Sequence, residues 1–224
     1  MNLQGLEAII FDFDGVLVES VDVKTRAFAA LYADYGEEVV AKVTEYHLRH
    51  GGISRFEKFR YFQTDILHGP ALDDRAVADL ATSFSSLVVD RVVAAPMVEG
   101  AREFLDNCRD RLPLFIVSGT PTEELDEILR RRKLREFFAA IRGSPGSKSR
   151  QISELLNEHR LAAARSIMIG DAIADYEGAV SNSVAFIGRV AGDTVNPFPS
   201  GVTTFENFSH LPREWQSLPT KCSR

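Results

Sequence analysis

The sequence predicts a doubly wound α/β fold with a mostly parallel sheet, into which an all-helical segment is inserted after the first strand. Three short apolar runs, at residues 8–11, 114–117 and 167–169, are each followed at once by polar residues. Segments with helical spacing alternate with the later runs, whereas the long stretch between the first two runs contains no convincing buried strand. Such alternation is typical of helices that cover both faces of a parallel sheet.

The three apolar runs are the predicted strands. Each lacks the alternation of polar and apolar residues that a half-exposed strand shows, so each suits a strand buried on both faces. Residues 184–187 form a further apolar run. In the tail from about residue 192, which is expected to be rich in loops, residues 202–205 predict one short edge strand.

Two helices are predicted between these strands. Thr120 is expected to be an N-cap, with Pro121 as the first helical residue and Glu123 as the third, which would form a capping box. This helix should end near residue 132, and the basic run at residues 130–133 would then complement the helix dipole. A second helix is predicted over residues 151–160.

Residues 18–94 predict the helical insert. Apolar residues recur at helical spacing over residues 28–35, and residues 75–93 predict a long helix. Between them, Gly51 and Gly52 indicate a turn, after which Ser54 is placed to cap a further helix. We therefore expect an α/β core made of residues 1–17 and 95–224, with residues 18–94 as a separate helical domain.

Composition bounds the possible functions. The chain has 224 residues, 45% of them hydrophobic, which predicts one domain or one domain with a modest insert. The apolar runs are too short to cross a bilayer and the N-terminus lacks a signal-peptide pattern, so we expect a cytoplasmic protein without a membrane partner. The net charge of −6 argues against nucleic acid as a partner. Cys108 and Cys222 match no metal-ligand spacing and are expected to be reduced thiols.

The candidate site lies where the predicted strands end. Asp12, Ser118 and Asp171 each follow an apolar run, and ligands of open α/β sheets bind at the carboxyl ends of the strands. Asp14 and Asp175 add two carboxylates to the same edge. Four carboxylates would repel one another without a cation, and their hard oxygen atoms suit Mg²⁺.

Each of these features also has a simpler interpretation. Asp175 alone would more often cap a helix, residues 118–120 would more often form a turn, and Lys148 alone would be a solvated lysine. His47 and His50, one helical turn apart, are expected to be hydrogen-bonded rather than bound to a metal. The order and placement of the whole set therefore carry the hypothesis.

Four segments, taken in order, resemble the motifs of the haloacid dehalogenase (HAD) superfamily. Residues 11–20, FDFDGVLVES, resemble its nucleophile motif, and Ser118-Gly119-Thr120 resembles the second motif. Lys148 stands where the third motif places a lysine, and residues 170–175, GDAIAD, resemble the fourth. The helical insert resembles the cap of the subgroup that includes phosphoglycolate phosphatase and β-phosphoglucomutase. The resemblance thus implies a Rossmann-like core with a cap domain.

The resemblance also implies the chemistry of the aspartates. Asp12 would attack phosphorus to form an aspartyl-phosphate. Asp14 would act as general acid and base, for which its surroundings would have to raise its pKa. Mg²⁺ would be held by the Asp12 carboxylate, the main-chain carbonyl of Asp14 and Asp171, with Asp175 orienting a ligand or water. Since dehalogenase members lack the second aspartate, which phosphatases and phosphomutases have, Asp14 favours phosphoryl chemistry. We expect a phosphatase that acts on a small phosphorylated metabolite.

Other residues are assigned binding roles by the same resemblance. Ser118, Gly119 and Lys148 would bind the phosphoryl oxygens, although Ser149 replaces a proline that follows the lysine in many relatives, and Arg142 is a weaker substitute. Specificity is expected from the cap, whose candidate residues are Arg55, His50 and Lys24.

Two alternatives remain open. A sugar-phosphate phosphomutase is disfavoured because Lys24 stands where such enzymes carry a histidine. A non-catalytic, phosphate-accepting signalling module is disfavoured by the helical insert and by Asp14. The substrate and the oligomeric state are not predicted.

Overall fold

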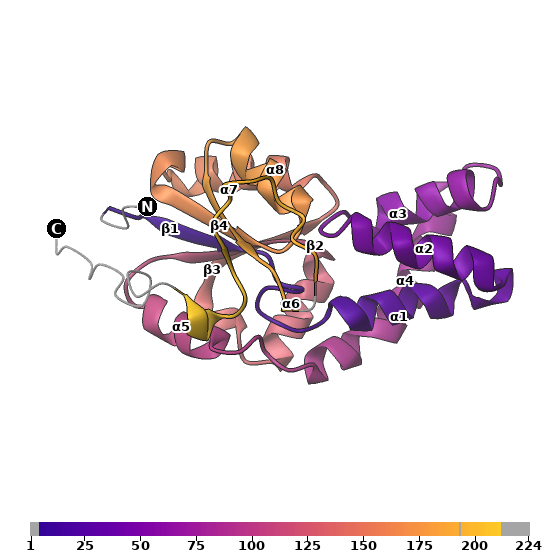
Figure 1. Cartoon of the computed structure of the whole chain (residues 1–224), viewed down its shortest axis with the longest axis horizontal. Helices are drawn as coiled ribbons and strands as arrows, with labels where there is room; N and C mark the ends of the chain where they lie inside the picture. Colours follow the sequence, from indigo (N-terminus) through magenta and orange to yellow (C-terminus); the bar gives the residue numbers. More distant parts are fainter. Residues whose placement is uncertain (1–4, 193, 212–224) are drawn as a thin grey trace.

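The computed structural model describes residues 5–192 and 194–211, and it contains a six-stranded, fully parallel sheet of order β3-β2-β1-β4-β5-β6 (Figure 1). The strands are β1 Ala8–Phe11, β2 Leu114–Pro121, β3 Phe138–Ser144, β4 Ser166–Gly170, β5 Ala185–Arg189 and β6 Thr204–Phe205. The chain builds the sheet outward from β1 to one side and then, from β4, to the other. The switch point where α/β folds bind ligands therefore lies beside β1.

Helices cover both faces of the sheet, and together with it they form what is called the α/β core below. They are α5 Ala101–Cys108, α6 Thr122–Arg131, α7 Lys148–His159 and α8 Ile173–Ser181. Ile9 and Phe11 of β1 belong to the apolar cluster with α5 and α6, whereas Ala8 and Ile10 belong to the cluster with α7 and α8. Because successive side chains of a strand point to opposite faces, a wholly apolar β1 is buried on both sides, as predicted.

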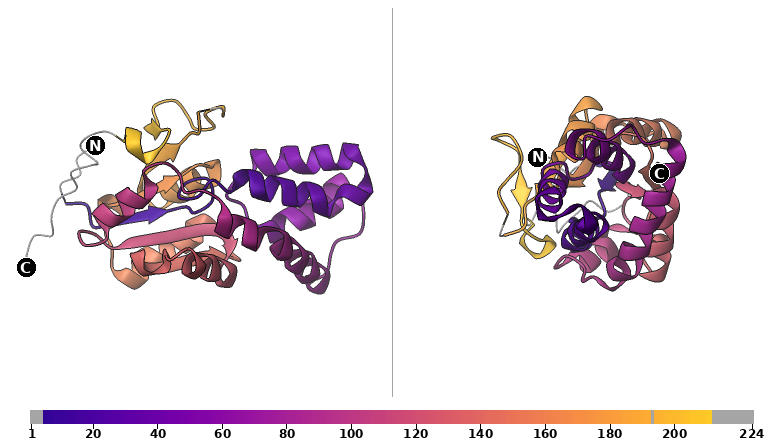
Figure 2. Two further views of the ribbon diagram at one scale, coloured as in Figure 1. Left: turned by 90° about the horizontal axis from the view of Figure 1, so that it is seen from below. Right: turned by 90° about the vertical axis from the view of Figure 1, so that its right-hand side faces the viewer.

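Residues 21–94 contain four α-helices, called the helical insert below, which lie beyond one end of the sheet (Figures 1 and 2). They are α1 Val21–Leu31, α2 Glu37–Arg49, α3 Arg55–Tyr61, which continues as a π-helical turn, and α4 Asp74–Ala94. Phe28 packs against Phe59, Phe62 and Phe84, so aromatic rings fill the centre of the insert. Ser54 caps α3 as predicted, since its Oγ accepts a hydrogen bond from the main-chain N–H of Phe56.

The chain segments that enter and leave the helical insert are hydrogen-bonded to each other. Val18 and Met97 form an antiparallel bridge. The N–H of Glu19 donates to the carbonyl of Pro96 at 3.0 Å, and the N–H of Val98 donates to the carbonyl of Leu17 at 3.0 Å. The insert is therefore attached to the α/β core through a paired double connection.

One local prediction, the start of the helix near residue 120, is wrong in detail. Thr120 lies in β2 rather than at a helix N-cap, and α6 begins at Thr122 after Pro121. The Thr120 side chain instead hydrogen-bonds Asp14, as described below. In the basic run, Arg132 Nη1 donates to the carbonyl oxygens of Val92, Val93 and Ala95 at the C-terminal end of α4, each at 2.7 Å. Arg132, which directly follows α6, thus joins the insert to the core.

The other elements that were predicted agree closely with the structure. The helix predicted over residues 151–160 begins three residues earlier, at Lys148, and the predicted edge strand is β6. Cys108 is buried, whereas Cys222 lies outside the described residues. No helix in the described part of the chain combines the length and apolar character needed to cross a membrane.

Candidate active site

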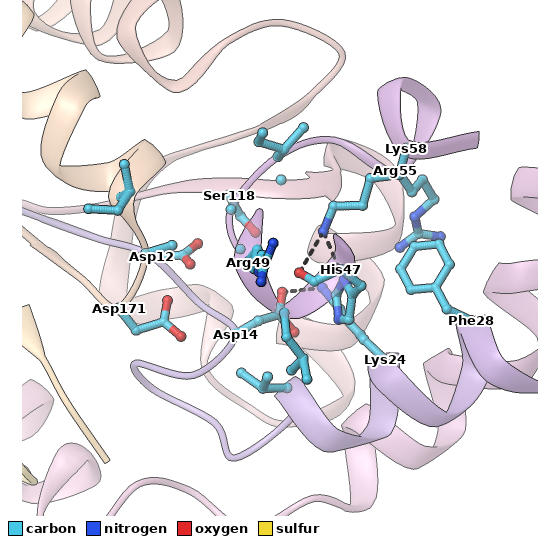
Figure 3. A pocket seen from close by; sticks show the side chains of 18 of the residues that line it. Asp12, Asp14, Lys24, Phe28, His47, Arg49, Arg55, Lys58, Ser118 and Asp171 are labelled. Carbon is cyan, nitrogen blue, oxygen red and sulfur yellow. Dashed lines mark hydrogen bonds and ion pairs between the residues drawn. The ribbon is translucent and has the colours of Figure 1, made fainter. Parts of the chain in front are cut away.

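The carboxyl ends of the central strands place five of the predicted residues around one cavity: Asp12, Asp14, Ser118, Gly119 and Asp171. Phe11 of β1 pairs with Ile116 of β2 and Ile169 of β4, so the residues that follow these positions come together. The cavity has a volume of about 150 Å³ and lies between the α/β core and the helical insert (Figure 3). Its core side is lined by Asp12, Asp14, Ser118, Gly119 and Asp171, and its insert side includes Lys24, His47, Arg49, Arg55 and Lys58.

The aspartates form a site that fits a divalent cation. One carboxylate oxygen each from Asp12, Asp171 and Asp175 lie within 4.8 Å of one another. Burial raises the pKa of Asp12 to about 7 despite the opposing effect of Lys148, and burial together with the charge of Asp12 raises the pKa of Asp171 well above its usual value. Burial thus disfavours the charged forms of these carboxylates, and a hard cation held by carboxylate oxygens would offset that effect.

The loop that follows Asp14 packs closely against this cluster. Gly15 has a φ of +76°, and a Cβ atom there would lie 2.1 Å from Asp171 Oδ2. Arg189 at the end of β5 donates to the carbonyl of Gly15 at 2.7 Å and forms an ion pair with Glu19. Only glycine fits this position, because it combines a left-handed conformation with close approach of a carboxylate.

Lys148 is buried against two of the aspartates. It is the first residue of α7, which Ser147 caps, and its Nζ lies 3.0 Å from Asp12 Oδ1 while also contacting Asp175 Oδ1. Burial lowers the pKa of Lys148, but the charges of Asp12 and Asp175 outweigh burial and raise it. Lys148 is therefore charged beside Asp12, and Asp175, whose Oδ2 accepts from the N–H of Ala172, orients it.

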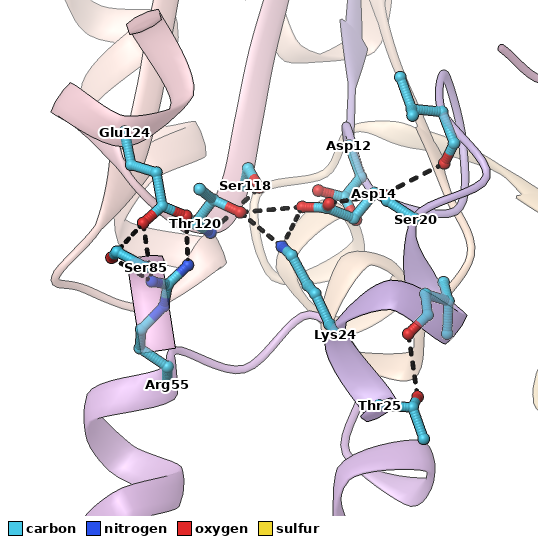
Figure 4. A network of polar contacts seen from close by, with 12 residues as sticks. Asp12, Asp14, Ser20, Lys24, Thr25, Arg55, Ser85, Ser118, Thr120 and Glu124 are labelled. Atoms are coloured by element: carbon cyan, nitrogen blue, oxygen red, sulfur yellow. Dashed lines mark hydrogen bonds and ion pairs between the residues drawn. The ribbon is translucent and has the colours of Figure 1, made fainter. Parts of the chain in front are cut away.

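Asp14 is held by three side chains (Figure 4). Ser20 Oγ donates to Asp14 Oδ1 at 2.6 Å, Thr120 Oγ1 donates to Asp14 Oδ2 at 2.8 Å, and Lys24 Nζ contacts the same Oδ2. Burial acts to raise the pKa of Asp14, but Lys24 and the hydroxyl groups outweigh it and lower the pKa. The expectation that the surroundings raise this pKa is wrong, because three donors stabilise the carboxylate form.

Arg55 lines the cavity, but its guanidinium is already bound. Nη1 and Nη2 donate to Glu124 of α6 at 2.8 and 2.5 Å, and Nη1 also donates to Ser85 of α4 at 2.9 Å (Figure 4). Its guanidinium carbon lies 4.6 Å from the centre of the Phe84 ring. Arg55 thus joins the helical insert to the α/β core.

Two of the other predicted candidates lie away from the cavity. His50 is not part of the described lining: its ring stacks on Tyr46 at 3.9 Å and its Nδ1 lies 2.9 Å from the Tyr46 carbonyl. Arg142 forms an ion pair with Glu158. Lys24, by contrast, lines the cavity and contacts Asp14.

Several side chains at the site were not predicted. Ser20 and Thr120 lie within the quoted motifs, yet no spacing in the sequence indicates that their hydroxyl groups hydrogen-bond Asp14. The Nζ atom of Lys58 lies 2.8 Å from Nδ1 of His47. No spacing in the sequence indicates that Lys58 lines the cavity.

Comparisons with known proteins agree with this fold. Residues 6–181 match the family of haloacid dehalogenase-like hydrolases. A phosphoglycolate phosphatase of Synechococcus elongatus is 27% identical over 177 residues, which cover 78% of this chain and 79% of the relative.

Solved structures share the architecture at low sequence identity. A β-phosphoglucomutase from Clostridium difficile has a TM-score of 0.75 at 16% identity, covering 94% of this chain and 97% of its own. CbbY from Rhodobacter sphaeroides, solved in complex with phosphate, has a TM-score of 0.72 at 20% identity, covering 92% and 96% of the two chains. Since the family match spans most of the chain, including β1 and the ends of β2 and β4, the protein belongs to the haloacid dehalogenase-like hydrolases.

Proposed function

We propose that this protein is a Mg²⁺-dependent phosphatase that hydrolyses a small phosphomonoester through an aspartyl-phosphate on Asp12. The observation that carries the proposal is the arrangement at the end of β1. Asp12 lies beside Lys148, and Asp14, two residues later, lies beside Lys24 and Thr120. A nucleophilic carboxylate next to a buried cation suits attack on an anionic phosphoryl group.

The residues of the α/β core take complementary roles in this proposal. Lys148 and Ser118 bind the phosphoryl oxygens, assisted by the main-chain N–H near Gly119. Asp14 acts as a general acid that donates a proton to the leaving oxygen, and later as a general base that accepts a proton from the attacking water. Because Lys24 lowers the pKa of Asp14, the proton transfer requires that this ion pair weaken when substrate binds.

The metal would be held by Asp12, Asp171 and the main-chain carbonyl of Asp14, whose side chain is engaged elsewhere. When bound, Mg²⁺ would offset the repulsion between the carboxylates and the phosphoryl group. Asp175 supports the site by orienting Lys148.

The helical insert would serve as the cap that excludes water and selects the substrate. Its Gly51-Gly52 turn supports this role: a Cβ added at Gly119 of β2 would lie 2.7 Å from the Gly52 carbonyl oxygen. The substrate is a small phosphorylated metabolite, for which phosphoglycolate, the substrate named for one relative, is a candidate. The division into residues 18–94 and the remainder stays part of this proposal.

The test is a phosphate-release screen over sugar phosphates, phosphoglycolate, nucleotides and phospho-acids with Mg²⁺, run beside Asp12→Asn. We expect steady turnover of at least one ester and a loss of at least about 1,000-fold in the variant, because the nucleophile is removed. Equal phosphate release by both proteins would show that Asp12 is not the nucleophile.

The same screen separates the alternatives. A phosphomutase would retain phosphate on the enzyme and require a bisphosphate activator. A signalling module would be phosphorylated once without steady turnover.

A further inference from the structure

One cation of the cavity lacks an anionic partner. The other cations in the lining are each paired with a carboxylate: Lys24 with Asp14, Arg49 with Glu45, and Arg55 with Glu124. Within residues 5–192 and 194–211, no carboxylate lies within ion-pair distance of Lys58, which is buried and whose Nζ faces His47 instead. A buried ammonium without a counter-anion is unfavourable unless a ligand supplies one.

His47 offers a second unused donor beside Lys58. When Lys58 is charged, its ammonium group can only donate, so His47 Nδ1 accepts and the imidazole proton sits on Nε2. Nε2 is buried, has no hydrogen-bond partner within the described structure, and belongs to a side chain that lines the cavity and is 7% exposed. Burial, followed by the charge of Lys58, lowers the pKa of His47 to about 2, so the ring stays neutral and keeps this donor.

The charge balance around Lys58 also indicates a missing anion. Burial lowers the pKa of Lys58 to about 7, and the charges of Lys24 and Arg55 contribute to this lowering. A bound anion would reverse this effect, since opposite charge favours the ammonium form. Lys58 and His47 lie on the insert side of the cavity, opposite Asp12 and Asp171 (Figure 3).

The size of the cavity limits what can reach both sides. A cavity of about 150 Å³ is similar in volume to one that holds a molecule about as large as benzene. A phosphoryl group on Asp12 therefore leaves room for a tail of only a few atoms. A carboxylate is the anion that fits there most easily, because it is planar and smaller than a second phosphate.

We propose that Lys58 and His47 bind the distal carboxylate of a short phosphorylated carboxylic acid, whose phosphoryl group lies at Asp12. This inference rests on the proposed phosphatase function and names its substrate class. It also assigns the specificity role expected of Arg55, whose guanidinium is occupied by Glu124 and Ser85, to Lys58, one helical turn further along α3.

The test compares kcat/KM for phosphoglycolate with that for ethyl phosphate, which has no carboxylate. We expect the wild type to favour phosphoglycolate, and Lys58→Met to lower that preference by about 10- to 100-fold, as loss of a charged hydrogen-bond donor does. Lys58→Arg, which keeps the charge, should recover part of the preference. Lys42→Met is the matched control, because it removes an exposed lysine from α2 of the same insert and should leave the preference unchanged.

Three outcomes would overturn the inference: a wild type that favours ethyl phosphate, equal losses on both esters in Lys58→Met, or a preference for ethylene glycol bisphosphate that depends on Lys58, which would identify a second phosphate instead. Thermal unfolding of each variant shows whether it folds. If the wild type hydrolyses no phosphomonoester at all, the proposed phosphatase function fails, which is a different result from a wild type that hydrolyses both esters without preference.

Discussion

The ion pair between Arg55 and Glu124 predicts how firmly the helical insert closes on the α/β core. The two side chains are 4% and 8% exposed and are joined by two parallel hydrogen bonds, with Ser85 bridging both (Figure 4). Arg55 and Ser85 belong to the insert, whereas Glu124 belongs to the core. Glu124→Gln removes the charge with little change in shape, so it probes the pair directly.

The expected cost follows from the burial of the pair. Removing one member of a buried ion pair costs about 3–5 kcal/mol when the other charge stays buried. Glutamine keeps one acceptor for Arg55, so we expect about 2–3 kcal/mol for Glu124→Gln. Because the pair spans insert and core, movement of the insert would return Arg55 to water. The cost should therefore appear as a shift of about 30- to 150-fold toward the open arrangement.

Small-angle scattering and limited proteolysis at the two connections would measure this opening. The variant should have a larger radius of gyration and faster cleavage, while its thermal midpoint changes little. Glu127→Gln is the control, because Glu127 lies on the same helix but is 54% exposed and forms a surface ion pair, which is worth little. A large loss of thermal stability without opening would refute the reasoning, since the pair would then stabilise only the folded state as a whole.

Two further predictions concern pH and the nucleophile loop. The pKa of Lys58 is about 7 in the folded protein and 10.5 for an ordinary lysine side chain in water, so the unfolded chain binds more protons between these pH values. The free energy of unfolding measured with urea should therefore rise from pH 7 toward pH 10 in the wild type. Lys58→Met should lack this rise. Gly15→Ala should lower kcat/KM by at least about 100-fold, because its Cβ would meet Asp171 Oδ2, and Mg²⁺ titration should show weaker binding. Unchanged metal affinity in that variant would contradict the proposed site.

The parts of the fold that the sequence predicts are those set by local pattern. The wholly apolar run of β1 identifies a central strand, and Ser54 identifies the start of α3. β3 was not predicted, because it lies at the edge of the sheet and its residues alternate irregularly between buried and exposed. α5 was not predicted either, since only one of its faces is apolar and its eight residues give a short pattern.

The candidate site divides in the same way. Asp12, Ser118 and Asp171 could be placed because strand ends of a parallel sheet meet at one edge. The contact of Lys24 with Thr120 could not, because it depends on how the helical insert docks on the core. The contact of Lys58 with His47 depends on how α2 and α3 pack within the insert, and no local spacing encodes either arrangement. The direction of the Asp14 pKa was mispredicted for the same reason.

The bridge between Val18 and Met97 bears on how such a chain can be modular. The bridged segments lie side by side like the base of a hairpin. The whole insert is therefore one long loop between two positions of the core that are already in contact. Closing such a loop costs entropy that grows only slowly with its length. Helices can thus be exchanged, enlarged or deleted above this base without rerouting any strand of the sheet, and a short turn joining Val18 to Met97 would leave the topology of the core intact.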